Sequence, residues 1–350
     1  MTSERFLKMG YLLLPFCLVG NESFSTGQFY GLMTMIMAGV GIYYITDRWI
    51  RGFMIYFAIW QGSLWVASLI SVKCIALAHN SMEMFTQTTI LSLLWIYVSR
   101  LKKNVIDENS IFNVICVAAL IQTVIGWFQV FGISLYDYVL SPFVIVKSEM
   151  AAAVTGMLQN NNFLAGFMAI SAIFFFRKKW LFGLIPIIPL FYFMNTRTAV
   201  ISLCAGIAVK YRIYWKIFVP VMAVIAILFM VFTRGIPLPF SGIAGDRYDI
   251  WLKVLAFMFS DWTRLLCGNS PGLVMSGNIH NEYLTIFMKF GFVGLTFMAG
   301  YIWNLPRDHK ILYPAMIVAL VNMIGNFPME LPVTMALITI IAGMLERCRK

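Results

Sequence analysis

The chain has 350 residues, of which 61% are hydrophobic and only 12% are charged, and its formal net charge is +11. A soluble fold of this length needs a charged shell to stay dissolved, whereas a bilayer accepts apolar side chains on the outer faces of helices. The composition therefore excludes an ordinary soluble protein and predicts an all-α polytopic membrane protein.

Apolar runs between polar breaks predict about twelve transmembrane helices. The predicted spans are residues 5–20, 28–46, 50–71, 82–98, 111–131, 162–176, 180–194, 198–210, 214–232, 282–304, 310–326 and 330–345. The first run follows Arg5 and Lys8 without a cleavage site of small residues, so we expect a retained span and not a signal peptide. With no repeat or low-complexity segment visible, we expect residues 1–350 to form a single integral membrane domain.

The distribution of Lys and Arg predicts the orientation, because these side chains resist translocation. If the N-terminus lies inside, most of the 26 basic residues fall in inner loops or tails. These are Arg5, Lys8, Arg48, Arg51, Arg100, Lys102, Lys103, Arg177, Lys178, Lys179, Lys210, Arg212, Lys216, Arg307, Lys310, Arg347, Arg349 and Lys350. We therefore expect both termini in the cytoplasm and a location in the bacterial inner membrane. The positive charge follows from this topology and does not indicate nucleic-acid binding, since it forms no stripe with interleaved aromatics.

The six cysteines show no CxxC spacing, and most of them fall inside apolar spans. Neither a structural disulfide nor a cysteine-based metal site is expected from this pattern.

Two predicted outer segments are long, residues 132–161 and 233–281, whereas most other loops have a few residues. Long loops of a compact membrane protein commonly carry function. The second contains GDRYDIWLKVLAFMFSDW, whose spacing predicts a helix lying along the membrane surface, with Asp246 and Asp249 capping its first turn. Its predicted packed face consists of Ile250, Trp251, Val254, Leu255 and Met258.

Three residues on the outer side indicate chemistry. Arg197 stands in NTRTAV, Arg247 opens the surface helix, and His280 stands in NIHNEYL where the long loop re-enters the membrane. Arginine suits phosphate because its planar fork donates two parallel hydrogen bonds and keeps its charge. Histidine suits proton transfer near neutral pH. Together they predict chemistry on a phosphate-bearing lipid.

Each of these residues also has a simpler interpretation. An arginine at a helix end often extends to the lipid headgroups, and a single histidine at a loop end is more often structural. His79 and His309 are assigned to that structural class. Lys147, Arg234 and Arg264 are expected to meet phospholipid headgroups.

Five motifs stand in a fixed order along residues 150–300: TGMLQNNNFLAGFMA, TRTA, DRYDIW, GNSPG and HNEYLTIFMKFGFVGL. In this order and on this topology they resemble the O-antigen ligase and polymerase superfamily of membrane glycosyltransferases. The first half of the chain contributes compatible hydropathy only.

The resemblance implies a GT-C-like fold and a role in lipopolysaccharide biosynthesis: transfer of a glycan from undecaprenyl diphosphate to an acceptor outside the inner membrane. It implies His280 as the base that activates the acceptor hydroxyl, and Arg197 with Arg247 as the diphosphate clamp. By hydrogen-bonding chemistry, Asn281 or Glu282 is expected to orient the histidine ring, and Arg264 is expected to support the site. Neither a metal ion nor another cofactor is expected, since two guanidinium groups can offset the charge on a departing diphosphate.

The acceptor is left open by the sequence. The chain is short for the superfamily and lacks the C-terminal periplasmic extension of protein O-oligosaccharyltransferases, which favours a glycan or lipid acceptor. A ligase acting on lipid A core and a polymerase extending a second carrier-linked glycan both remain open. A polysaccharide transporter or flippase is the alternative of another class; it should place charges or broken helices near the midplane, and Lys289 is the clearest charge inside a predicted span.

Overall fold

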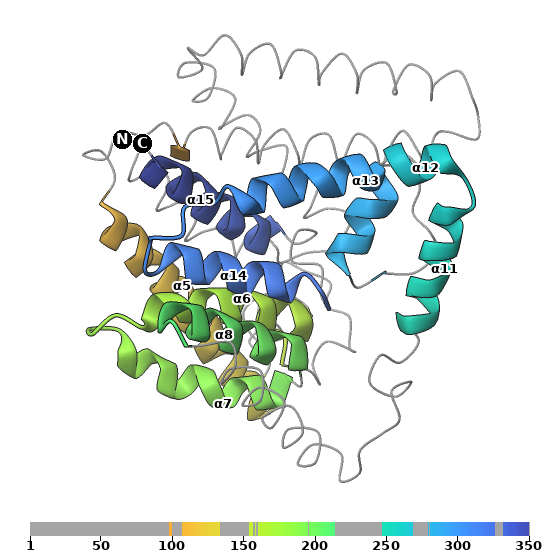
Figure 1. Ribbon diagram of the computed structural model, residues 1–350. Coiled ribbons are helices and arrows are strands. Elements are labelled where there is room, and N and C mark those ends of the chain that lie inside the picture. Colours follow the sequence, from red (N-terminus) through yellow and green to blue (C-terminus); the bar gives the residue numbers. More distant parts are fainter. Residues whose placement is uncertain are drawn as a thin grey trace, which may run out of the picture.

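The structure is a computed structural model (Figure 1) that describes residues 98–99, 107–133, 154–156, 158, 160–194, 196–213, 247–268, 279, 281–325 and 332–349. Within these residues the chain forms helices, turns and loops and no strand. The prediction of an all-α protein is confirmed for this part of the chain. The predicted spans 5–20, 28–46, 50–71 and 214–232, and nearly all of 82–98, lie outside the described residues.

Each of the other seven predicted spans coincides with a described helix. Together with two helices inside the predicted outer segment 233–281, the α-helices of the described residues are α5 (Glu108–Val130), α6 (Asn161–Phe175), α7 (Leu184–Met194), α8 (Arg197–Lys210), α11 (Arg247–Phe259), α12 (Trp262–Cys267), α13 (Glu282–Trp303), α14 (Leu312–Asn322) and α15 (Pro332–Arg349). The predicted span 180–194 differs at its start, since Leu181–Gly183 forms a 3₁₀ turn and the α-helix begins only at Leu184.

Two of these helices, α5 and α13, are long and apolar enough to cross a membrane. Three further apolar helices are shorter: Asn161–Phe175, Leu181–Met194 and Leu312–Asn322. A helix needs about 20 apolar residues to cross the hydrocarbon core upright. By length and composition, therefore, α5 and α13 are the candidate spans in the described part of the chain.

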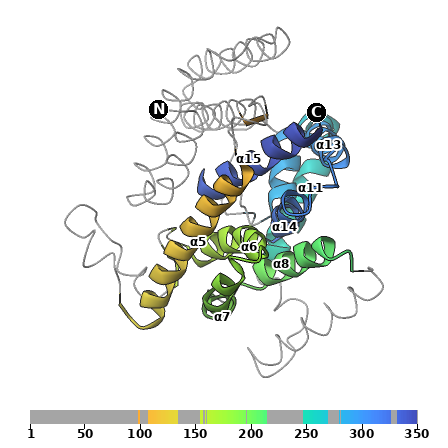
Figure 2. The ribbon, with the colours of Figure 1, turned by 90° about the vertical axis from the view of Figure 1, so that its left-hand side faces the viewer.

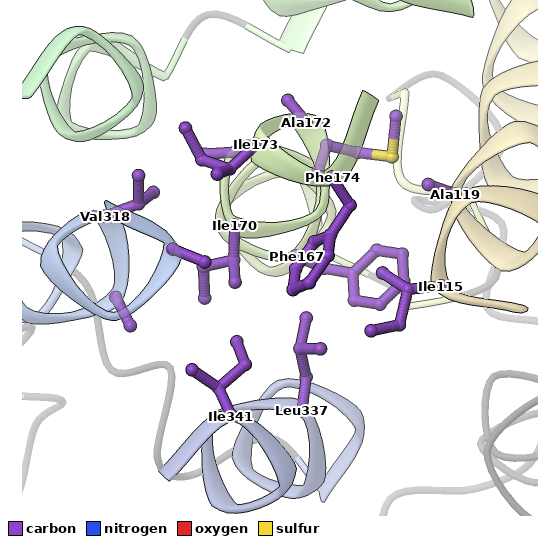
Figure 3. Packing of buried hydrophobic residues seen from close by; sticks show 14 of the residues in the cluster. Ile115, Ala119, Phe167, Ile170, Ala172, Ile173, Phe174, Val318, Leu337 and Ile341 are labelled. Carbon is purple, nitrogen blue, oxygen red and sulfur yellow. The ribbon is translucent and has the colours of Figure 1, made fainter. Parts of the chain in front are cut away.

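Helix α6 lies at the centre of the larger helix cluster (Figure 2), where it packs against α5, α7, α8, α14 and α15. All residues from Leu164 to Phe175 are buried, which is typical of a helix surrounded by other helices. Figure 3 shows its side chains Phe167, Ile170 and Phe174 meeting residues of α5, α14 and α15. Small residues permit close approach elsewhere: a methyl group on Gly206 of α8 would collide with Val318 of α14.

Helices α11, α12 and α13 form a second cluster beside the first (Figure 1). The predicted helix within the long loop is confirmed as α11, and its predicted face packs: Val254 and Met258 are fully buried against Phe287 and Met288 of α13. Ile250, Trp251 and Leu255 are partly buried in the same cluster.

The predicted span 282–304 overlaps α13, but the helix is not continuous. Helix α13 is interrupted at Gly291, whose φ of 62° and ψ of −159° are not helical. The physical cause is a close main-chain approach, because a Cβ at Gly291 would collide with the carbonyl group of Leu266 in α12. A residue without a side chain is required where φ is positive and another backbone is this near.

Candidate functional site

The candidate site lies where three helices begin and two others end. Asn161, at the start of α6, donates through Nδ2 to the carbonyl oxygen of Met194 at the end of α7, over 3.1 Å. The main-chain N–H of Glu282 donates to the carbonyl oxygen of Met323 over 2.9 Å, joining the start of α13 to the end of α14. A methyl group on Gly325 would lie 2.5 Å from Oγ1 of Thr198, so the same end of α14 also touches the start of α8.

Arg197 is the first residue of α8 and is partly exposed. The start of its helix and the start of α13 both contact the segment Asn322–Gly325 at the end of α14. Helix N-termini carry unsatisfied N–H groups and a partial positive charge, which favour anions. The arrangement therefore brings Arg197 at the start of α8 and the capped start of α13 to one region of the fold.

The start of α8 has a residue of a capping type at its N-cap, but the side chain of this residue forms no capping bond. Thr196 occupies the N-cap position with an extended backbone, but its hydroxyl accepts no hydrogen bond from the first turn. Asp107, Asn160, Asp261 and Asn281 do cap α5, α6, α12 and α13 with their side chains. Thr196 is only 4% exposed, and its Oγ1 is buried without a hydrogen-bond partner among the residues described.

Asn281 and Glu282, the proposed supports of the histidine ring, open α13 and are both buried. The Oδ1 atom of Asn281 accepts from the N–H of Leu284 over 3.1 Å, so this side chain caps the helix. The carbonyl oxygen of Asn281 accepts from the hydroxyl of Thr285 over 3.0 Å. The capping role is a finding beyond the sequence prediction, although asparagine just before an apolar run is a recognisable helix-start signal.

His280 itself lies outside the described residues, but both of its neighbours in the chain are fixed. On one side, the indole Nε1 of Trp251 donates to the carbonyl oxygen of Ile279 over 2.7 Å. On the other side, Asn281 is held as the N-cap of α13. Trp251 is a residue that the sequence assigned only to packing, and it ties α11 to the segment that carries the candidate base.

The structure describes the side chain of Arg264 but not that of Arg247. Arg247 is the first residue of α11, and its side chain lies outside the described residues. The side chain of Arg264 turns to its own segment: Nη1 donates to Oγ of Ser260 over 3.2 Å, and the guanidinium carbon lies 4.4 Å from the ring centroid of Phe257. The contacts that the structure gives Arg264 are therefore local to α11 and α12.

Asp261 holds the start of α12 through its neighbour Thr263. The carboxylate accepts from the hydroxyl and from the main-chain N–H of Thr263, both over 2.8 Å. These bonds favour the charged carboxylate, and so they lower the pKa of Asp261 from its ordinary value of 3.8.

Gln129, in the last turn of α5, is a residue whose role the sequence analysis missed. Its Oε1 accepts from the N–H groups of Thr155 and Gly156 over 2.9 and 2.8 Å, and its Nε2 donates to the carbonyl oxygen of Gly156 over 3.2 Å. A single side chain thus satisfies the irregular backbone just before α6, as buried polar groups require. A polar residue near the end of an apolar span is the sequence signal that could have identified it.

The opposite end of the helix cluster carries an ion-paired group. Arg347 of α15 donates through Nη2 to Oε1 of Glu108 over 2.7 Å, and Nε2 of His309 lies 3.3 Å from Oε2 of the same carboxylate. On the other side of the ring, Nδ1 of His309 accepts from the N–H groups of Ile311 and Leu312 over 3.3 and 3.0 Å. His309 therefore caps α14 and links it to α5, consistent with a structural role.

Within the described part of the chain, side chains with metal-binding atoms gather at this same end: those of Glu108, His309 and Cys348 lie within 4.8 Å of one another. Because Nδ1 of His309 accepts two N–H groups, the ring proton belongs on Nε2, where it points to Glu108. A metal ion on Nε2 would require that proton on Nδ1, facing two donors. The hydrogen bonds thus oppose metal binding here.

Comparison with protein-family models, with curated proteins and with solved structures finds no match to the chain.

Proposed function

We propose that the chain is a glycosyltransferase of the O-antigen ligase and polymerase type, with about twelve membrane spans and both termini in the cytoplasm. It transfers a glycan from undecaprenyl diphosphate to an acceptor on the periplasmic side of the inner membrane. His280 acts as the base, Arg197 and Arg247 bind the diphosphate, and Asn281 and Glu282 support His280. The preferred acceptor is lipid A core, which makes the enzyme a ligase in lipopolysaccharide biosynthesis.

The observation that carries this proposal is the meeting of two distant segments at the end of α14. Arg197 begins the helix that touches Gly325 through Thr198, and Asn281 precedes the residue whose N–H binds Met323. The diphosphate-binding residue and the segment of the candidate base are far apart in sequence, and a transferase needs both at one site. The position also suits charge stabilisation, since the N-terminus of α8 and arginine favour the departing diphosphate.

The orientation is supported by where the basic residues of α8 lie. Arg197 stands at the start of α8, and Lys210, one of the residues assigned to the cytoplasm, stands at its end. Lys210 donates to the carbonyl oxygen of Lys310, another residue assigned to the cytoplasm. Reporter fusions at Gly242 and at Lys103 test the topology. An outer location for Gly242 and an inner location for Lys103 are expected, and the reverse would overturn the orientation and the site together.

A polysaccharide transporter is the second candidate, and the interruption of α13 at Gly291, close to Lys289, is the observation that favours it. Transporters use broken helices to expose backbone groups to a cavity. In α13 the interruption instead lies against the main chain of Leu266, which is the packing of a structural kink. We therefore prefer the transferase.

Reconstitution tests the proposal and separates its alternatives. Purified protein in liposomes is given an undecaprenyl-diphosphate glycan together with lipid A core or with a second carrier-linked glycan. Extension of lipid A core identifies a ligase, and extension of the second carrier-linked glycan identifies a polymerase. Movement of the intact donor across the bilayer without transfer would refute the enzyme and favour the transporter.

A further inference from the structure

Helix α8 has a threonine at its N-cap position, but the threonine side chain does not cap the helix. Thr196 belongs to a residue type that normally accepts a hydrogen bond from the first turn of a helix, and it stands at the N-cap position. Its hydroxyl forms no such bond, although the residue is 4% exposed and Oγ1 is buried. A buried hydroxyl without a partner destabilises a fold, so a role outside folding would explain its presence.

The surroundings of this hydroxyl favour an anion. The first turn of α8 presents main-chain N–H groups that cannot bond within the helix, and the helix has 14 residues. Arg197 follows directly and is partly exposed. Phosphate oxygens are the usual ligands of such a combination of first-turn amides and a guanidinium group.

We propose that Thr196 is a binding residue for the lipid diphosphate: its hydroxyl donates to a phosphate oxygen, and the first-turn amides of α8 bind the same phosphate. The proposal rests on the proposed function and adds a group that the arginines do not supply. Among the residues that the structure describes, the hydroxyl has no hydrogen-bond partner, and the substrate provides the acceptor.

Thr196→Val tests this inference because valine has nearly the same shape and lacks the hydroxyl. Removal of a partnerless hydroxyl should leave the melting temperature of the protein unchanged or raise it. The dissociation constant for undecaprenyl diphosphate in neutral phosphatidylcholine nanodiscs should rise on the order of tenfold to a hundredfold, the range for a hydrogen bond to a charged group. Thr196→Ser, which keeps the hydroxyl, should restore most of the affinity.

The matched control is Thr123→Val. Thr123 is also buried, but its hydroxyl already donates to the carbonyl oxygen of Ala119 over 2.8 Å, in the middle of α5. This variant should melt at a lower or equal temperature and bind the lipid diphosphate as the wild type does. Equal loss of affinity in Thr123→Val and Thr196→Val would mean that the effect is structural and would overturn the inference.

The probes also identify the source of the phosphate. Undecaprenyl diphosphate should bind more tightly than inorganic pyrophosphate, and phosphatidylglycerol should not displace it; equal competition by phosphatidylglycerol would assign the site to ordinary headgroups and contradict the inference. If Thr196→Val binds normally while Arg197→Lys does not, this inference fails and the proposed function stands. If the wild type binds none of the probes, both fail.

Discussion

The main-chain N–H of Glu282 donates to the carbonyl oxygen of Met323 over 2.9 Å, so the first turn of α13 rests on the last turn of α14. Two residues later in the chain, Gly325 lies against Thr198 in the first turn of α8. The end of α14 thereby holds two helix starts together. In the proposed enzyme one start carries the diphosphate-binding arginine and the other follows the candidate base.

Replacing Arg197 by lysine keeps the charge but removes the planar fork that makes two parallel hydrogen bonds. We expect donor affinity and transfer to fall on the order of tenfold to a hundredfold, because each hydrogen bond to a charged group contributes about 1.5–3 kcal/mol. Arg212→Lys is the matched control, since Arg212 is exposed just beyond the other end of α8. Normal donor affinity and transfer by Arg197→Lys would show that Arg197 only meets headgroups.

Gln129→Leu should leave the N–H groups of Thr155 and Gly156 buried without an acceptor, at a cost of about 2–4 kcal/mol in the free energy of unfolding. Gly156→Ala should also destabilise, because φ is +57° and a Cβ would lie 2.6 Å from Oε1 of Gln122. Thermal unfolding in nanodiscs measures both effects. Wild-type stability of Gln129→Leu would show that the segment before α6 does not depend on this side chain.

Chelation should leave glycan transfer intact. Of the metal-binding side chains in the described ranges, Glu108, His309 and Cys348 lie close together, but they belong to the end of the cluster opposite Arg197, and their hydrogen bonds oppose a metal ion. Arg347→Met should lower the stability by about 1–3 kcal/mol, because it removes the hydrogen bond from the guanidinium group to Glu108 and leaves that carboxylate with His309. Loss of transfer in EDTA that zinc or magnesium restores would refute the metal-independent mechanism.

The start of α12 should loosen in acid. The Thr263 hydroxyl and N–H lower the folded-state pKa of Asp261 below 3.8, so the cap contributes fully above the unfolded-state pKa and is lost as the pH falls through the lower folded-state pKa. Amide hydrogen exchange of residues 263–267, corrected for intrinsic rates, should therefore speed up below about pH 4. Asp261→Asn keeps an N-cap but does not titrate, so it should lose this pH dependence. A pH response that persists in the asparagine variant would contradict the assignment.

The sequence predicted those features of the fold that depend on residues close together in the chain, such as helix bounds and buried helix faces. The buried face of α11 was predictable because Val254 and Met258 recur at helical spacing, and helix bounds followed from apolar length. The break at Gly291 was not predictable, since its cause is the backbone of Leu266, which tertiary packing brings there. The bond between Glu108 and Arg347 joins residues 239 positions apart, and no sequence pattern relates them. Residue types alone indicated Arg197 and Asn281 as members of the candidate site. The roles of Thr196 and Gln129 were not predictable, because they depend on which hydrogen-bond partners the folded chain places beside each side chain.

The most direct test of the account is the transfer rate of His280→Ala compared with that of the wild type, measured with an undecaprenyl-diphosphate glycan and its acceptor in liposomes. A sugar hydroxyl is a poor nucleophile at neutral pH, and a positioned base typically accelerates its reaction by a factor on the order of 100 to 10,000. The account predicts a loss of that size, with the melting temperature and donor affinity of the variant unchanged. A variant that melts normally and transfers at the wild-type rate would contradict the assignment of His280 as the base and, with it, the proposed mechanism.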